Sequence, residues 1–286
     1  MLGLTLHVLA ARTGSYELCA KGAEHTDIEF HENAASRRRL QGACEGDQPL
    51  GCTGVHNANN QLCGATYISL YMAGQAPKSA LAPTEKIFQE EIAAMPSSNN
   101  FWSWGDAAFM AMNTWSRLGA ATRDVRYFSK QWANFNAAML EPANGDGGKR
   151  GTTFGFWNTT QHLFYRDDRY VHTEIYWGRG NGWAMGALVA AIQYGKNDPH
   201  LEDYVNIFKL HAAKLASIAS PVDGCWRSSL LNATGYPTPE MTGTSSFVYG
   251  MAFGVNSGIL DKATYGPVIA KVGPCRANAY HMIALF

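Results

Sequence analysis

One carboxylate stands beside tryptophan and glycine at the start of an apolar segment. Asp106 follows Trp104 and Gly105, and the small apolar residues 107–112 come directly after it. Burial among apolar groups disfavours an ionised carboxyl group, so the pattern predicts a raised pKa and a proton available for general acid catalysis. Asp106 could instead simply complement the positive end of a helix, and the local sequence alone favours that structural role.

A second polar stretch combines glycines with an arginine and two tryptophans. In residues 176–183, three glycines alternate with Arg179 and Asn181, and Trp177 and Trp183 stand on either side. We expect a loop here, because alternating glycines let the backbone approach a ligand and the planar Arg179 guanidinium matches a carboxylate. An acidic sugar fits this stretch, although Arg179 could equally bond carbonyls at a helix end. It is no dinucleotide fingerprint, because Trp183 stands where the third glycine belongs.

Two further stretches add polar groups that could border the same site. Residues 223–227 and 240–245, which include Thr242, carry acidic and hydroxyl side chains ahead of an apolar segment. Residues 163–168 place Arg166 directly after apolar and aromatic residues. The sequence contains no G-x-S-x-G, H-E-x-x-H or P-loop signature, and its six cysteines and nine histidines show no metal-ligand spacing. The sequence therefore predicts no metal site.

The elements that must position these residues are mostly α-helices. From residue 63 onward, apolar residues recur at helical spacing. The expected helices cover about residues 64–74, 81–95, 106–119, 126–139, 182–195, 201–219, 244–258 and 263–272. Small, apolar helices alternate with more charged ones, and a helix that is apolar all round is normally buried. The alternation predicts hairpins with an inner and an outer layer, closed into an α/α toroid, with an open solenoid as the alternative.

Local signals place the ends of these helices. Gly195 and Gly258 follow two of the segments, as expected of helix ends. Asn181 and Thr244 are expected to cap the segments that they precede. In a toroid the loops ahead of the inner helices gather at one end, and we expect the functional site there.

Composition excludes several kinds of partner. Of the 286 residues, 46% are apolar and 16% charged, with 23 basic and 23 acidic residues, which predicts a globular protein. This balance offers no electrostatic footprint for nucleic acid or an anionic membrane, and the longest apolar run, residues 183–192, is too short to span a bilayer. Residues 1–58 show no sustained apolar period and are expected to form a poorly ordered leader, with residues 59–286 as the toroid domain.

The cellular compartment stays open. Residues 2–11 resemble the apolar region of a signal peptide, but no Lys or Arg precedes them. The sequons at Asn158 and Asn232 are compatible with secretion. These features favour an extracellular location, with a cytoplasmic location as the alternative. Cys44 and Cys52 could form a disulfide.

Taken in order, the polar stretches resemble the unsaturated rhamnogalacturonyl hydrolases of glycoside hydrolase family 105. Residues 104–111 look like the family's W-x-D-[AT]-L-F-M segment, and residues 177–183 match its W-[GS]-R-G-N-G-W loop. Residues 223–227 and 240–244 resemble its D-G-L-W-R and E-T-S-G-T runs. The resemblance covers about residues 59–272 and implies an (α/α)6 barrel, of which four to five hairpins can be counted here.

This resemblance implies hydrolysis of Δ4,5-unsaturated uronyl oligosaccharides with Asp106 as the general acid. In the family the acid protonates the C4=C5 double bond, water adds at C5, and the resulting hemiketal opens to release the neighbouring sugar. Neither a metal nor an organic cofactor is implied, and the expected partner is a small oligosaccharide. The expected sugar-binding residues are Asn59, Trp104, Arg166, Trp177, Arg179, Trp183 and Thr242.

Two of these residues depart from the family pattern. Asn59 stands where the family usually has an aspartate that contacts substrate, which predicts weaker activity. Arg166 stands where many members have a histidine, which predicts a different leaving sugar. The alternatives are a non-catalytic sugar-binding protein of the same fold and an unfolded fragment whose open toroid exposes apolar edges.

Overall fold

Eight α-helices make up most of the part of the chain that the structure describes. The computed structural model describes residues 58–94, 102, 104–140, 155–171 and 173–272. The helices are α4 (Ala58–Met72), α5 (Ala82–Ala94), α6 (Asp106–Thr122), α7 (Val125–Phe135), α8 (Gly178–Tyr194), α9 (Leu201–Ser217), α10 (Met241–Asn256) and α11 (Lys262–Lys271). The expected all-α class is confirmed. The expected leader lies outside the described residues except for Ala58, which begins α4, and the expected Cys44–Cys52 disulfide also lies outside them.

Short elements complete this part of the chain. The 3-10 turns η1 (Lys78–Leu81) and η3 (Asp168–Tyr170) precede α5 and α8, and the π-helical turn η2 (Asn136–Leu140) extends α7. Strands β1 (Trp157–Asn158) and β2 (Leu163–Phe164) pair antiparallel, with Trp157 opposite Phe164. Among the helices described, none is both long and apolar enough to cross a membrane.

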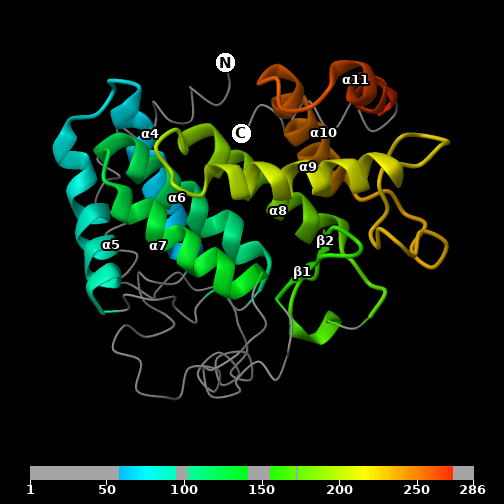
Figure 1. Cartoon of the computed structure of the whole chain (residues 1–286), viewed down its shortest axis with the longest axis horizontal. Coiled ribbons are helices and arrows are strands. Elements are labelled where there is room, and N and C mark those ends of the chain that lie inside the picture. Colours follow the sequence, from blue (N-terminus) through cyan, green and yellow to red (C-terminus); the bar gives the residue numbers. More distant parts are fainter. Residues whose placement is uncertain (1–57, 95–101, 103, 141–154, 172, 273–286) are drawn as a thin grey trace, which may run out of the picture.

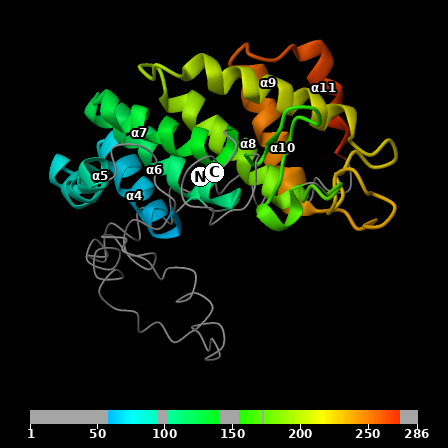
Figure 2. The same ribbon diagram turned by 60° about the horizontal axis from the view of Figure 1, so that its bottom comes forward.

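The helices form hairpins that follow one another across the molecule, from α4 and α5 to α10 and α11 (Figures 1 and 2). Helices α4, α6, α8 and α10 pack each on the next, and α7, α9 and α11 each pack on the inner helix before them. Phe109 and Trp183 lie 4.6 Å apart near the starts of α6 and α8, and Arg117 lies over Tyr194 near their ends. Helices α6 and α8 therefore run parallel, which places their N-termini at one end.

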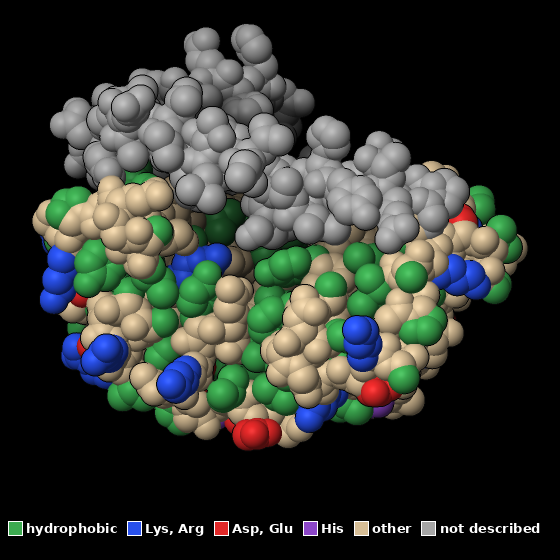
Figure 3. Space-filling view, turned by 90° about the horizontal axis from the view of Figure 1, so that it is seen from above, with side chains coloured by type: hydrophobic (Ala, Val, Ile, Leu, Met, Phe, Trp, Pro, Cys, Tyr) green, Lys and Arg blue, Asp and Glu red, His purple; other side chains and the backbone are tan. Residues whose placement is uncertain are grey.

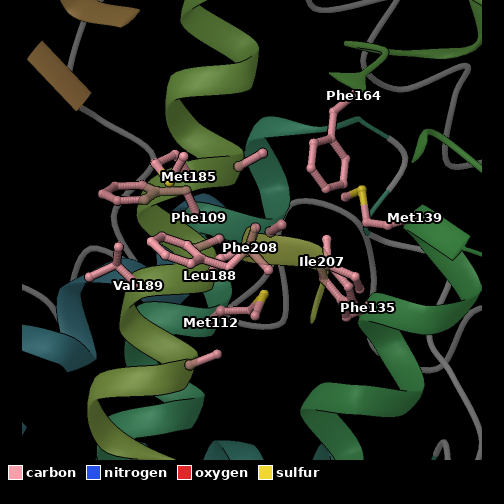
Figure 4. Packing of buried hydrophobic residues seen from close by; sticks show 14 of the residues in the cluster. Phe109, Met112, Phe135, Met139, Phe164, Met185, Leu188, Val189, Ile207 and Phe208 are labelled. Atoms are coloured by element: carbon pink, nitrogen blue, oxygen red, sulfur yellow. The ribbon is translucent and has the colours of Figure 1, made fainter. Parts of the chain in front are cut away.

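The core lies between the two helical layers. Met112 on α6, Leu188 on α8 and Phe208 on α9 point toward one another and are almost completely buried (Figure 4). Burial of one such side chain contributes about 1.5–3 kcal/mol to folding. On the face of the molecule shown in Figure 3, in contrast, charged side chains are scattered among apolar and other groups.

Glycines let the inner helices approach closely where their N-termini meet. A Cβ atom on Gly182 would lie 3.0 Å from Gly243 Cα, and one on Gly243 would lie 2.6 Å from the Gly178 carbonyl oxygen. Backbone atoms cannot move away as a flexible side chain can. The close contact of α8 with α10 therefore depends on the absence of side chains at these positions.

We expect Gly243→Ala to lower the free energy of unfolding by about 1–3 kcal/mol, because the added methyl group would force α10 away from α8. The matched control is Gly180→Ala, also in the first turn of an inner helix, where the new Cβ would lie 3.6 Å from its nearest neighbour, Asp106 Oδ1. Chemical denaturation of both variants measures the difference. Equal unfolding free energies would contradict this account of the contact.

The expectation of a loop at residues 176–183 is wrong. Helix α8 begins at Gly178, so most of this stretch is the first turn and a half of an inner helix. Tight packing against α10 overrides the low helix propensity of the glycines. The two expected caps are wrong for the same reason: Asn181 and Thr244 lie inside their helices, and the residues that precede α8 and α10 are Trp177 and Glu240.

Candidate active site

Two connecting segments lie against the N-termini of the inner helices. The Gly105 N–H, just before α6, donates to the Arg166 carbonyl at 2.6 Å. The Gly178 N–H at the start of α8 donates to the Ser228 carbonyl at 2.8 Å. The Glu240 N–H, just before α10, donates to the Trp226 carbonyl at 2.9 Å. The four polar stretches that the sequence singles out are thus brought to one end of the helices.

Asp106 is the first residue of α6 and is half-buried at this end. Its Oδ1 atom is completely buried and has no hydrogen-bond partner within the described part of the chain. A side chain on Gly180 would begin 3.6 Å from that oxygen and 3.9 Å from Arg166 Cβ, so all three residues border one point. Glycine at position 180 leaves room beside the carboxyl group.

Burial raises the pKa of Asp106, and the nearby charges act in both directions. The positive charges of Arg166 and Arg179 lower this pKa, and the negative charge of Asp167 raises it. Burial outweighs the two arginines, so the pKa is raised from its ordinary value, as the sequence predicts. A carboxyl group of this kind holds its proton at higher pH than an exposed aspartate.

Arg166 and Arg179 supply the positive charge around Asp106. The Arg166 side chain is 40% exposed, and its Nη1 donates to Asp167 Oδ2 at 2.5 Å. The Arg179 side chain is 64% exposed, and its Nε lies 3.6 Å from Glu240 Oε1. Both guanidinium groups are therefore anchored by a carboxylate and still accessible to an anionic ligand.

Glu240 joins two of the inner helices. Its carboxylate accepts a hydrogen bond from the Gly243 N–H and so caps the start of α10. The same carboxylate pairs with Arg179 in the first turn of α8. The sequence contains Glu240 in a polar stretch, but only the spatial contact between the two helices shows this second role.

The predicted tryptophans differ in their surroundings. Trp177 is half-buried, and its ring makes edge contacts with Tyr170 at 5.6 Å and Tyr236 at 5.3 Å. Trp104 is half-buried next to Gly105. Trp183 packs at 4.6 Å on Phe109 of the core, although part of it is exposed. Sequence reasoning missed both tyrosines, because they come from different segments and meet only in space.

Thr242 and Asn59 complete the predicted set. Thr242 is the second residue of α10 and half-buried, and its carbonyl accepts from the Ser246 hydroxyl at 2.9 Å. Asn59 is exposed in the first turn of α4. Two residues later, the Gln61 carbonyl accepts from the Thr114 hydroxyl at 2.6 Å. Thr114 lies about two turns beyond the start of α6, so Asn59 lies nearer the middle of that helix than its N-terminus.

Asn181 has a structural role at the same end. Its side-chain carbonyl accepts from the Phe164 N–H at 2.8 Å, and its amide donates to the Phe164 carbonyl at 3.0 Å and the Trp177 carbonyl at 2.9 Å. Asn181 thus ties β2 to α8, and β2 leads within two residues to Arg166. No group of three or more His, Cys, Asp or Glu side chains that could hold a metal ion occurs in the described residues.

Successive helical hairpins with connecting segments over the N-termini of the inner helices define the fold of the six-hairpin glycosidases. Residues 29–273 match the model of Glycosyl Hydrolase Family 88, and the chain belongs to this family. A solved structure described as a glycosyl hydrolase family 88 protein from Bacteroides vulgatus aligns with a TM-score of 0.66 at 24% identity, covering 80% of this chain and 63% of that one.

The expected likeness to family 105 is also confirmed at the level of the fold. A family 105 structure from C. acetobutylicum aligns with a TM-score of 0.58 at 17% identity, covering 78% of this chain and 63% of that one. The described residues contain four helix hairpins.

Two curated relatives align with most of this chain. The chain is 28% identical over 244 residues to the unsaturated 3S-rhamnoglycuronyl hydrolase of Alteromonas sp. (strain LOR) and 27% identical over 252 residues to that of Formosa agariphila. These matches cover 76% and 79% of this chain. The chain spans 55% and 63% of the lengths of these relatives.

Proposed function

We propose that this protein hydrates the C4=C5 double bond of Δ4,5-unsaturated uronyl oligosaccharides and thereby separates the unsaturated uronic acid from the neighbouring sugar. The observation that carries the proposal is the Asp106 carboxyl group, whose buried Oδ1 has no partner in the described residues and borders the space left by Gly180. The names of the two curated relatives support the same substrate class.

Asp106 acts as the general acid in this proposal. The C4=C5 double bond lies next to the ring oxygen and is therefore an enol ether. Transfer of the Asp106 proton to C4 leaves a cation at C5 that the ring oxygen stabilises. The raised pKa of Asp106 keeps this proton available, and the positive charges of Arg166 and Arg179 stabilise the carboxylate that forms.

Water then completes the reaction. Its oxygen bonds to C5, and the proton that it loses can return to the Asp106 carboxylate. The resulting hemiketal opens by breaking the bond between C5 and the ring oxygen, which leaves a hemiacetal at C1. Collapse of that hemiacetal breaks the bond to the neighbouring sugar, so one water is consumed and the acid is regenerated. The two-carboxylate scheme of ordinary glycosidases is not used.

The substrate carboxylate is assigned to Arg179. Its guanidinium is 64% exposed and anchored on Glu240, which suits bidentate binding of a uronate. Trp177, with Tyr170 and Tyr236 at its edge, offers a flat aromatic surface for the sugar ring. Trp104, Trp183, Thr242, Arg166 and Asn59 remain proposed contacts.

We expect Arg179→Gln to lower kcat/KM by about 10- to 100-fold, chiefly through KM, because it removes a charge-assisted hydrogen bond to the substrate carboxylate. The matched control is Arg126→Gln, which removes an exposed arginine that pairs with Asp124 on the outer layer. Steady-state kinetics of both variants measure the difference. Equal KM values for the two variants would remove Arg179 from the binding site.

The experiment that tests the function follows the ultraviolet absorbance of the double bond in a panel of unsaturated disaccharides. A uronyl unit linked to rhamnose comes first, because the relatives are named for rhamnoglycuronyl substrates. The proposal predicts decay of the absorbance for at least one member and no cleavage of the saturated counterpart. A chain that binds the disaccharide but leaves its absorbance unchanged would instead be a non-catalytic sugar-binding protein.

A further inference from the structure

Asp167 is a buried carboxylate that the reaction described above does not use. Its Oδ2 accepts from Arg166 Nη1 at 2.5 Å and from Arg169 Nη2 at 2.7 Å. Its Oδ1 accepts from Arg169 Nε at 3.0 Å and from the Arg169 backbone N–H at 3.1 Å. The Asp167 side chain is 8% exposed, compared with 40% for Arg166 and 69% for Arg169. Four hydrogen bonds fix this carboxylate, which in turn fixes both guanidinium groups.

Arg166 has a second carboxylate within reach. The Arg166 carbonyl accepts from the Gly105 N–H, one residue before Asp106. Arg166 Cβ and Asp106 Oδ1 lie 3.9 and 3.6 Å from the same point beside Gly180. The Arg166 charge already lowers the pKa of Asp106, and Asp106 Oδ1 has no partner within the described residues, so a guanidinium released from Asp167 can turn toward it and pair with its ionised form. Such a pair would favour ionised Asp106 and remove the acid from the reaction.

We propose that Asp167 is a positioning residue, which holds the Arg166 guanidinium toward the substrate and prevents it from pairing with Asp106. This role rests on the proposed function, because it matters only where Asp106 must donate a proton. Arg169 is the second anchor: its bidentate contact keeps the Asp167 carboxylate in the orientation that Arg166 needs. Local sequence does not show this role, since Asp167 also precedes a short 3-10 turn and accepts from the Arg169 backbone N–H within it.

The charges that face Asp106 make the proposal testable by pH. They are Arg166 and Asp167 on the segment before η3 and Arg179 on α8. Removing the Asp167 charge lowers the pKa of Asp106 directly and also by releasing Arg166. Removing the Arg166 charge raises that pKa. The alkaline limb of the kcat profile reports deprotonation of the acid, so it moves to lower pH in the first case and to higher pH in the second.

The experiment compares Asp167→Asn with Asp168→Asn, the same chemical change at the exposed neighbouring residue. We expect Asp167→Asn to lower kcat/KM by about 10²-fold at the wild-type optimum and to shift the alkaline limb to lower pH. Asp168→Asn is expected to match the wild type, and Arg166→Gln to shift the limb the opposite way. In the Arg166→Gln background, Asp167→Asn is expected to lower kcat/KM little further, because the two residues act as one unit.

Each outcome decides the question. Wild-type turnover with indistinguishable Asp167→Asn and Asp168→Asn variants overturns the positioning role and leaves the proposed function intact. A kcat/KM loss without a shift of the alkaline limb, or an undiminished loss in the Arg166→Gln background, shows a merely structural residue. A wild type that alters no disaccharide overturns the proposed function and this role together. If the Asp167→Asn variant melts below the assay temperature, Asp167→Glu takes its place, because this substitution keeps the negative charge but displaces it. Asp168→Glu is then the control, and the same criteria apply.

Discussion

Replacing Asp106 by asparagine is expected to lower kcat by about 10²- to 10⁴-fold while the protein remains folded. The amide has nearly the same shape as the carboxyl group but cannot donate an acid proton to C4. The other carboxylates described at this end are already engaged, because Asp167 is bonded by two arginines and Glu240 by Arg179 and the Gly243 N–H. Absorbance decay measured with wild type and variant at equal concentration gives the ratio.

The same substitution is expected to stabilise the protein near neutral pH. Burial raises the pKa of Asp106 in the folded chain above its ordinary value of 3.8, so ionisation of this group opposes folding. The stabilisation from protonated Asp106 is complete below the unfolded pKa and is lost as the pH rises through the folded pKa. The amide of the Asp106→Asn variant does not ionise, so the variant avoids this loss. An Asp106→Asn variant that is more active than expected and less stable than the wild type at neutral pH would contradict both the role of Asp106 as the general acid and its raised pKa.

Replacing Asn181 by alanine is expected to lower the free energy of unfolding by about 2–5 kcal/mol. The substitution leaves the buried Phe164 N–H and carbonyl groups without their partners, and each unpaired group costs about 1–3 kcal/mol. We also expect activity to fall, because β2 then no longer holds the segment that leads to Arg166. Chemical denaturation and steady-state kinetics measure the two effects.

The matched control is Asn206→Ala on α9, where the asparagine is exposed. A surface substitution of this kind changes the unfolding free energy by about 0.5 kcal/mol or less. If Asn181→Ala and Asn206→Ala unfold at the same denaturant concentration, Asn181 does not hold β2 against α8. If only Asn181→Ala is destabilised but its kcat is unchanged, the tie supports the fold without supporting the site.

Hydrophobic periodicity predicts all eight helices of the described chain and their pairing into hairpins. The largest errors lie at the N-termini of inner helices, and α4 begins at Ala58 where residue 64 is expected. Helix α8 begins at Gly178 where residue 182 is expected, and α10 begins at Met241 where residue 244 is expected. These first turns are rich in glycine and hydroxyl residues, which have low helix propensity. They are helical because α8 and α10 pack backbone against backbone there, which no local pattern reveals.

The candidate acid could be predicted from its neighbours, whereas its surroundings could not. Asp106 follows Trp104 and Gly105 and begins an apolar helix, which allows burial and a raised pKa but by itself favours a structural role at the helix start. The resemblance of residues 104–111 to the family segment is what selects it as the acid. The Arg166 charge that acts on its pKa comes from a residue sixty positions away in the sequence, and the tie from Asn181 to β2 depends on the orientation of α8. Asp167 resembles an ordinary turn residue until its two arginines are located in space.

The most direct test of the central claim measures two quantities in one reaction of the wild-type protein with an unsaturated uronyl-rhamnose disaccharide. One is the loss of the double-bond absorbance, and the other is the amount of rhamnose released. Hydration by Asp106 predicts that both proceed together, one rhamnose for each double bond lost, and that Asp106→Asn slows both equally. Release of rhamnose with the double-bond absorbance intact would show direct cleavage of the glycosidic bond and would contradict the proposed reaction.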